Sequence, residues 1–114
     1  MTDDCIFCKI IRDETPSDKV YEDETVVAFE DIHPAAPTHI LIVPKNHIAS
    51  INAMEPDDEK TVGHLFTVAR KLAKQLGVSE SGYRLIINTG PDSGQVVYHL
   101  HLHLLGGREM GHLG

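Results

Sequence analysis

Three histidines at alternate positions are the residues of this chain best suited to chemistry. His99, His101 and His103 are separated by single leucines. Successive side chains of a strand point to opposite faces, so the imidazoles would line one face and the leucines the other. Imidazoles in a row suit proton transfer, metal binding or phosphate chemistry better than they suit a core. The pattern predicts catalysis or phosphate binding, with an exposed edge strand or a purely metal-binding strand as the alternatives.

The central histidine, His101, is the expected nucleophile. A neutral imidazole attacks phosphorus and also moves protons near pH 7. Its neighbours on the same face lie about 7 Å away along the strand. One neighbour can therefore contact a leaving group while the central ring attacks. We expect a backbone carbonyl or another group to hold one ring nitrogen of His101 and leave the other free.

The segment 88–95 leads directly into the histidines and contains two glycines. Glycines let backbone N–H groups approach an anion closely. Asn88, Ser93 and Gln95 add side-chain donors to this segment. We predict that it contacts phosphate, and the alternative is an ordinary surface connection between strands.

Two residues upstream have weaker signals. His39 opens an apolar run that reads as a buried strand, so it would either orient another imidazole by hydrogen bonding or be an ordinary core histidine. Asp31 precedes Ile32 at the start of a proline-containing loop. Its carboxylate would either accept hydrogen bonds from ribose hydroxyls or simply begin a turn.

The two cysteines, Cys5 and Cys8, have the C-x-x-C spacing of half a metal site. With His47 and one histidine of the strand, here His99, they would form a tetrahedral Cys2His2 set for zinc. A redox pair or two inert thiols are the alternatives. A disulfide framework is not expected, because both cysteines lie in one short segment.

Hydrophobic spacing indicates the elements that would position these residues. Apolar residues recur at i, i+3, i+4 spacing over residues 56–76, which predicts a long helix that begins at Pro56 and ends before Gly77. Short connections early in the chain and a single crossover helix favour an α+β fold with a mostly antiparallel sheet. The expected strands are 19–22, 25–29, 39–43, 83–88 and 98–105, with helical turns at 5–11 and 47–52 and loops at 31–38 and 89–95.

Composition bounds the class of protein. At 114 residues, with 41% hydrophobic and 24% charged residues, the chain predicts one globular domain over residues 1–114. A net charge of −7 argues against a nucleic-acid polymer as partner, because such binding depends on Lys and Arg. No apolar run is long enough for a bilayer, and the acidic residues 1–4 do not open a secretory signal. We therefore expect no membrane partner and a cytoplasmic location.

The histidine segment and its flanks resemble the histidine triad superfamily, whose signature is His-φ-His-φ-His-φ-φ with φ apolar. Residues 99–105 match this signature at every position. Residues 29–39 resemble the family segment Asp-Ile-x-Pro-x-Ala-Pro-Thr-His. Residues 94–98 and 106–110 resemble the Hint branch, the purine nucleoside phosphoramidases. The similarity covers nearly the whole chain.

The resemblance implies an α+β fold with a mostly antiparallel five-stranded sheet, one long helix, a short N-terminal helix, and a homodimer that joins two sheets. It implies hydrolysis of a nucleoside 5′-phosphoramidate through a nucleotidyl-histidine intermediate on His101, without a catalytic cofactor. His103 would contact the phosphate or leaving group, His99 would support His101, and His39 would orient the catalytic histidines. The implied purine-nucleotide contacts are Asp31 at the ribose, Asn88, Gly94, Gln95 and Val96 near the phosphate, and Ile6, Phe7, Ile10, Phe29, Ile32 and Leu41 around the base.

Two departures from that family matter. Some phosphoramidases have a serine where this chain has Val96, and valine cannot donate a hydrogen bond to the phosphate or leaving group. Many Hint proteins lack the cysteines, whereas some bacterial relatives and the galactose-1-phosphate uridylyltransferases bind zinc through such a C-x-x-C, a later histidine and the first histidine of the strand. This likeness favours structural zinc on Cys5, Cys8, His47 and His99.

Two other functions stay open at this point. A dinucleoside polyphosphate hydrolase or nucleotidyl transferase would use the same histidines, although Gly106 and Gly107 after the triad favour a phosphoramidase. The second alternative is a nucleotide-binding interaction module with little turnover.

Overall fold

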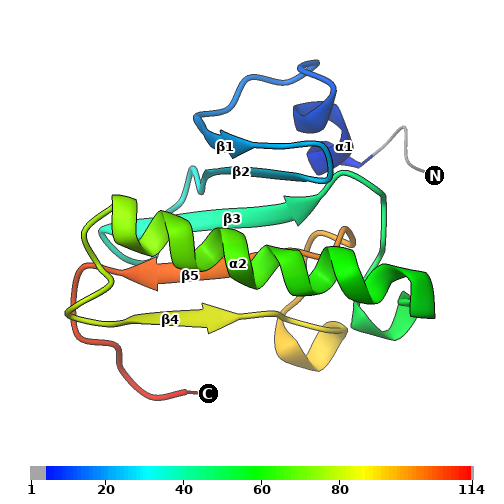
Figure 1. Cartoon of the computed structure of the whole chain (residues 1–114). Coiled ribbons are helices and arrows are strands. Elements are labelled where there is room, and N and C mark those ends of the chain that lie inside the picture. Colours follow the sequence, from blue (N-terminus) through cyan, green and yellow to red (C-terminus); the bar gives the residue numbers. More distant parts are fainter. Residues whose placement is uncertain (1–4, 114) are drawn as a thin grey trace.

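A five-stranded antiparallel sheet carries one long helix on one face and a short helix on the other (Figure 1). The structure is a computed structural model that describes residues 5–113, so the expectation about residues 1–4 lies outside the described residues. The strands run in the order β1-β2-β3-β5-β4, and every neighbouring pair is antiparallel. The predicted α+β fold with five strands is confirmed. The elements are α1 (Ile6–Ile11), β1 (Lys19–Glu22), β2 (Val26–Glu30), β3 (Thr38–Pro44), α2 (Glu59–Gln75), β4 (Tyr83–Ile86) and β5 (Leu102–Gly106), with short 3-10 turns at Ile51–Ala53, Pro56–Asp58 and Pro91–Ser93.

The two faces of the sheet bury different sets of side chains, because alternate residues of a strand point to opposite sides. Ile40 and Ile42 of β3 pack under α2 with Leu100, Leu102 and Leu104. The intervening positions of β2 and β3 face α1, where they form a smaller cluster with two of its side chains. That cluster contains Phe7, Ile10, Val27, Phe29, Leu41 and Val43. The leucines between the histidines therefore lie on the opposite face from the imidazoles, as predicted, and α2 covers that face.

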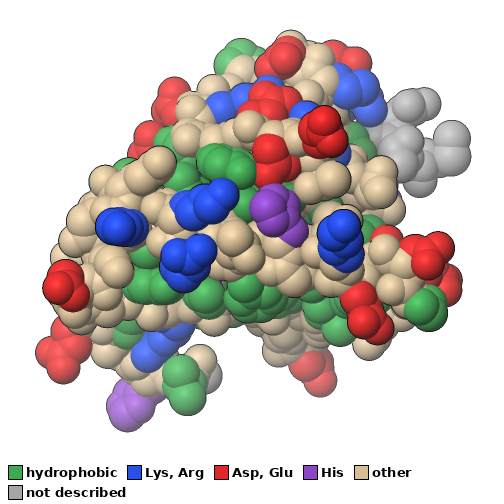
Figure 2. Space-filling model, viewed as in Figure 1, with side chains coloured by type: hydrophobic (Ala, Val, Ile, Leu, Met, Phe, Trp, Pro, Cys, Tyr) green, Lys and Arg blue, Asp and Glu red, His purple; other side chains and the backbone are tan. Residues whose placement is uncertain are grey.

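The long helix begins later than its apolar pattern suggested. Pro56 opens a 3-10 turn, and the Asp58 carboxylate accepts the backbone N–H of Glu55 at 2.9 Å, so regular α-helix starts only at Glu59. Figure 2 shows mainly Lys and Arg side chains over the outer surface of α2, with acidic side chains near its N-terminal end. Among residues 5–113, no helix is long and apolar enough to cross a membrane.

The histidine strand is shorter than predicted. We expected a strand over 98–105, but β5 begins only at Leu102, opposite Ile42 of β3. Backbone groups ahead of Leu102 have other partners: the N–H of Leu100 donates to the Ile48 carbonyl at 2.6 Å, and the carbonyl of His99 accepts a hydrogen bond from a side chain. The first two histidines therefore lie in an irregular segment that still alternates its side chains.

Asp23 ties the β1–β2 turn to α2. Its carboxylate accepts hydrogen bonds from the N–H groups of Thr25 and Val26, each at 2.8 Å, and from the Tyr21 hydroxyl and His64 Nε2, each at 2.7 Å. Burial raises the pKa of this carboxyl, but the hydrogen bonds outweigh burial and hold the pKa well below its usual value. The ionised form is therefore favoured by folding.

We expect Asp23→Asn to lower the free energy of unfolding by about 1–3 kcal/mol at pH 7, since hydrogen bonds to a charged group are lost. A depressed pKa contributes stability above the unfolded pKa of about 3.9 and loses it as the pH falls toward the folded value. The variant should therefore lose less stability than the wild type below pH 4. Urea unfolding between pH 3 and 7 measures both effects, with Glu24→Gln in the same turn as control. Equal stability of Asp23→Asn and wild type at pH 7 would contradict this role.

Candidate active site

A cavity of about 500 Å³ lies on the face of the sheet that carries α1. His101 and His103 line it together with apolar side chains of α1, β2 and β3. The lining includes most of the expected contacts, namely Ile6, Phe7, Ile10, Phe29, Asp31, Ile32, Leu41, Asn88, Gly94 and Val96. The cavity is thus mainly apolar, and its ionisable lining residues are His33, His101, His103, Glu30 and Asp31.

The ring of His101 is held in a single tautomer. Its Nδ1 lies 2.8 Å from the backbone carbonyl oxygen of His99. A carbonyl oxygen only accepts, so Nδ1 carries the proton and Nε2 has the lone pair. Burial lowers the pKa of His101 and outweighs the opposing effect of this hydrogen bond, which keeps the ring neutral at pH 7. A buried imidazole with one free nitrogen is a competent nucleophile.

His39 and His103 form a hydrogen-bonded pair that fixes two further tautomers. The N–H of Ala35 donates to His39 Nδ1 at 3.0 Å, so the proton of His39 is on Nε2. His39 Nε2 donates to His103 Nδ1 at 2.9 Å, which leaves the proton of His103 on Nε2. That N–H is buried and has no protein partner among the described residues. On a residue that lines the cavity, such a group is a donor available to a ligand.

The imidazole that His39 contacts is His103, which the sequence did not specify. The register explains the contact: β3 pairs Leu41 with His103 and His39 with Leu105, so His39 and His103 are diagonal neighbours on one face. Burial and the neighbouring His101 lower the pKa of His103 to about 4. His103 therefore stays neutral over the range in which most enzymes work.

Asp31 lies beside this pair. One carboxylate oxygen accepts the N–H of His33 at 2.8 Å, and the other is 3.5 Å from His39 Nε2. The ligand atoms of Asp31, His39 and His103 lie within 4.8 Å of one another, as in some metal sites. Here, however, the proton on His39 Nε2 occupies the position a metal would need. The arrangement is a hydrogen-bonded pair with a nearby carboxylate, and it leaves Asp31 able to accept ligand hydroxyls.

Gln95 and Val96, both expected near the phosphate, differ in how they lie relative to the cavity. The side chain of Gln95 is buried, accepts the N–H of Gly90 at 2.9 Å and donates to the carbonyls of Ala49 and Val97. It holds the 88–95 loop in shape and does not line the cavity. Val96 does line the cavity but is 86% exposed, so its side chain lies at the mouth.

Residues 15–17 also line the cavity, and the sequence interpretation missed them. Thr15, Pro16 and Ser17 lie between α1 and β1 and carry no periodic pattern. A turn-like composition was their only signal, and it does not indicate which way a loop faces.

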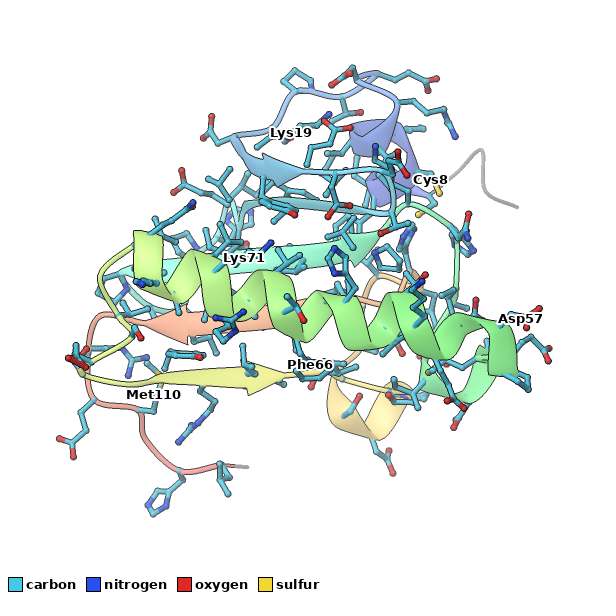
Figure 3. The ribbon with its side chains drawn as sticks, in the orientation of Figure 1. Cys8, Lys19, Asp57, Phe66, Lys71 and Met110 are labelled. Carbon is cyan, nitrogen blue, oxygen red and sulfur yellow. The ribbon has the colours of Figure 1, made fainter. Side chains whose placement is uncertain are left out.

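Cys5, Cys8, His47 and His99 come together beside the cavity, with all four ligand atoms within 4.8 Å of one another. The two sulfurs lie 3.3 and 3.6 Å from Nδ1 of His99. These separations are close to the roughly 3.5 Å that Zn–S and Zn–N bonds of about 2.3 and 2.0 Å give in a tetrahedron. Figure 3 shows Cys8 on α1, near the carboxyl end of β3.

The tautomer of His99 also suits a metal. Its Nε2 donates to the carbonyl of Pro44 at 2.8 Å, so the lone pair is on Nδ1 and points to the sulfurs. Burial lowers the pKa of His99 to about 4, and burial with the neighbouring thiol raises the pKa of Cys8 to about 11. The donor set and geometry of the four Cys and His residues fit a closed structural zinc site, in which the thiols would bind as thiolates.

Comparison with known proteins agrees with the geometry. The sequence model of the HIT domain matches residues 12–110. The purine nucleoside phosphoramidase of Escherichia coli K12 is 54% identical over 111 residues, which span 97% of this chain and 93% of the relative.

Solved structures of HIT family proteins superpose closely on this chain. A HIT family hydrolase from Legionella pneumophila superposes with a TM-score of 0.92 at 52% identity, covering 95% of this chain and 96% of that one. A histidine triad protein from Clostridium difficile has a TM-score of 0.94 at 47% identity, covering 97% and 96%.

Proposed function

The chain belongs to the HIT domain family, and from that membership we propose that it hydrolyses purine nucleoside 5′-phosphoramidates to a nucleoside monophosphate and an amine. One observation carries the proposal: the His99 carbonyl fixes the proton of His101 on Nδ1, so Nε2 is unprotonated on a residue that lines the cavity. The name of the Escherichia coli relative supports the substrate class. The same proposal treats residues 1–114 as one HIT domain.

The first step is attack of His101 Nε2 on the α-phosphorus. The N–P bond to the histidine forms as the P–N bond to the amine breaks, and the bonding electron pair goes to the leaving nitrogen. His103 Nε2–H is a buried donor without a partner among the described residues, so it hydrogen-bonds the leaving nitrogen and stabilises its developing charge, while solvent supplies the proton that completes the amine. Water then attacks the phosphorus, the P–N bond to His101 breaks with its electron pair returning to Nε2, and the proton lost by the water goes to solvent as the nucleoside monophosphate is released.

The remaining walls bind and orient the nucleotide. The apolar side chains of α1, β2 and β3 offer a slot for a flat purine ring. Asp31 accepts hydrogen bonds from the ribose hydroxyls, and Asn88 and Gly94, which also line the cavity, contact the phosphate. His39 keeps the His103 proton directed into the cavity through its own fixed tautomer.

Zinc is part of this proposal as a structural ion. Cys5, Cys8, His47 and His99 would hold it as four protein ligands, which leaves no open position for substrate. The ligands come from the N-cap and first turn of α1, from the segment after β3, and from the segment before β5. Bound zinc would therefore fasten α1 to the sheet.

Homodimerisation and a cytoplasmic location belong to the same proposal. β4 forms one edge of the sheet, where a strand of a second copy could extend it. Light scattering of the purified protein tests the dimer directly.

A substrate comparison tests the proposed function. Adenosine 5′-phosphoramidate should be hydrolysed to AMP with a kcat/KM at least about a hundredfold above that for diadenosine triphosphate. The reverse preference would support the alternative dinucleoside polyphosphate hydrolase. Tight AMP binding without turnover of either compound would support the nucleotide-binding module.

A further inference from the structure

The ring of Phe7 packs against the ring of His101. Binding of a purine base by Phe7 would not need this contact. Phe7 lies on α1 between the two cysteines and is only 6% exposed. Its ring centroid is 5.1 Å from that of His101, with the planes at 88°, and 5.9 Å from that of His99, with the planes at 65°. Phe7 therefore packs edge-to-face against the candidate nucleophile and against the histidine whose carbonyl binds that nucleophile.

Phe7 is itself firmly held. Its ring packs on Phe29 of β2 at 5.4 Å, and its helix is anchored on either side by Cys5 and Cys8, whose sulfurs contact His99. Movement of the Phe7 ring would break its packing on Phe29 and on the two histidines. The Phe7 ring is therefore held in one position, against which another ring can pack.

The His101 ring needs a fixed contact of this kind. Its hydrogen bond to the His99 carbonyl fixes Nδ1 but leaves rotation about that bond, and the ring also packs against the rings of His103, at 4.8 Å between centroids, and Phe7. In-line attack depends on the direction of the Nε2 lone pair. A misplacement of about 1 Å costs on the order of a hundredfold in rate.

We propose that Phe7 is a positioning residue that holds the His101 imidazole in the orientation for attack on phosphorus. The inference rests on the proposed function for its kinetic consequence. The inference goes beyond the proposed function because it gives Phe7 a role through His101, independently of any contact with the purine base.

The two roles of Phe7 make different predictions. A base contact matters only for substrates that have a base, and its loss raises KM. A positioning contact matters for every phosphoramidate, and its loss lowers kcat. A ribose 5′-phosphoramidate with the same amine as the adenosine substrate separates the two.

Phe7→Leu is expected to lower kcat by about tenfold to a hundredfold for both substrates. Ile6→Ala, which removes another α1 side chain of the cavity without a ring contact to His101, should instead raise KM for the adenosine substrate. Phe7→Tyr keeps the ring and should restore kcat to within a few-fold of wild type. Zinc content and thermal melting of each variant are measured alongside, so that loss of the fold or of the metal is identified.

A purely structural or base-binding role would give a different result. Phe7→Leu would then raise only the KM of the adenosine substrate and leave kcat for the ribose compound unchanged, or a folded Phe7→Tyr would lose as much kcat as Phe7→Leu. Crystal structures of the wild type and of Phe7→Leu provide a readout free of catalysis. The His101 ring of Phe7→Leu should keep its hydrogen bond to the His99 carbonyl but turn about it or occupy more than one orientation, and an unchanged ring orientation would overturn the proposal. An inert wild type in which only Phe7→Leu shows the turned ring would refute the proposed function alone.

Discussion

His101→Gly is expected to lower hydrolysis of adenosine 5′-phosphoramidate by about 10⁴-fold or more, because it removes the nucleophile of a two-step reaction. The ring lies between the His99 carbonyl and Phe7, and its hydrogen bond is to a residue only two positions away rather than to another strand. AMP should therefore still bind, within about tenfold of the wild-type affinity. Steady-state kinetics and calorimetric AMP binding measure the two effects on one preparation.

Rescue by added imidazole is the control for His101→Gly. The variant leaves a space of imidazole size beside the cavity, so added imidazole should restore part of the activity. A variant that retains near-wild-type turnover would refute the assignment of His101. Loss of turnover together with loss of AMP binding would show that the ring serves binding rather than attack.

Loss of zinc from the cluster of Cys5, Cys8, His47 and His99 is expected to lower the stability of the protein strongly. The purified protein should contain about one zinc per chain, and Cys5→Ser/Cys8→Ser should contain none. Because structural zinc contributes its binding free energy to folding, the double variant should be less stable by about 3 kcal/mol or more, a fall in Tm of at least about 10 °C. Elemental analysis and calorimetric melting measure both.

A chelator supplies the matching control. It should lower the Tm of the wild type toward that of the double variant and leave the double variant unchanged. A wild-type protein that is metal-free as purified and melts at the same temperature with and without added zinc would contradict the structural site.

The sequence predicted the elements with strong periodicity and missed those set by distant partners. The α2 stripe and the alternation of His101 with its leucines each reflect local geometry, and both match the structure. The start of β5 could not be predicted, because the backbone N–H of Leu100 pairs with Ile48, more than 50 residues earlier. The same holds for the partner of His39, which depends on the β3–β5 register.

The site was predicted in its residue types rather than in its geometry. The spacing of Cys5 and Cys8 indicated half of a metal site, but the approach of His47 and His99 depends on the packing of α1 against the sheet. Gln95 is polar and close to the histidines in sequence, yet its amide binds loop backbone instead of lining the cavity. Local sequence cannot distinguish a ligand-binding amide from a loop-holding one, because both satisfy the same donors and acceptors.

The most direct test is to capture the intermediate. Wild-type protein mixed with adenosine 5′-phosphoramidate, quenched in base within one turnover and digested, should yield a peptide with AMP bound through nitrogen to His101, formed before AMP is released. An adduct on another residue, or AMP release at full rate with no adduct at any time, would contradict nucleophilic attack by this imidazole.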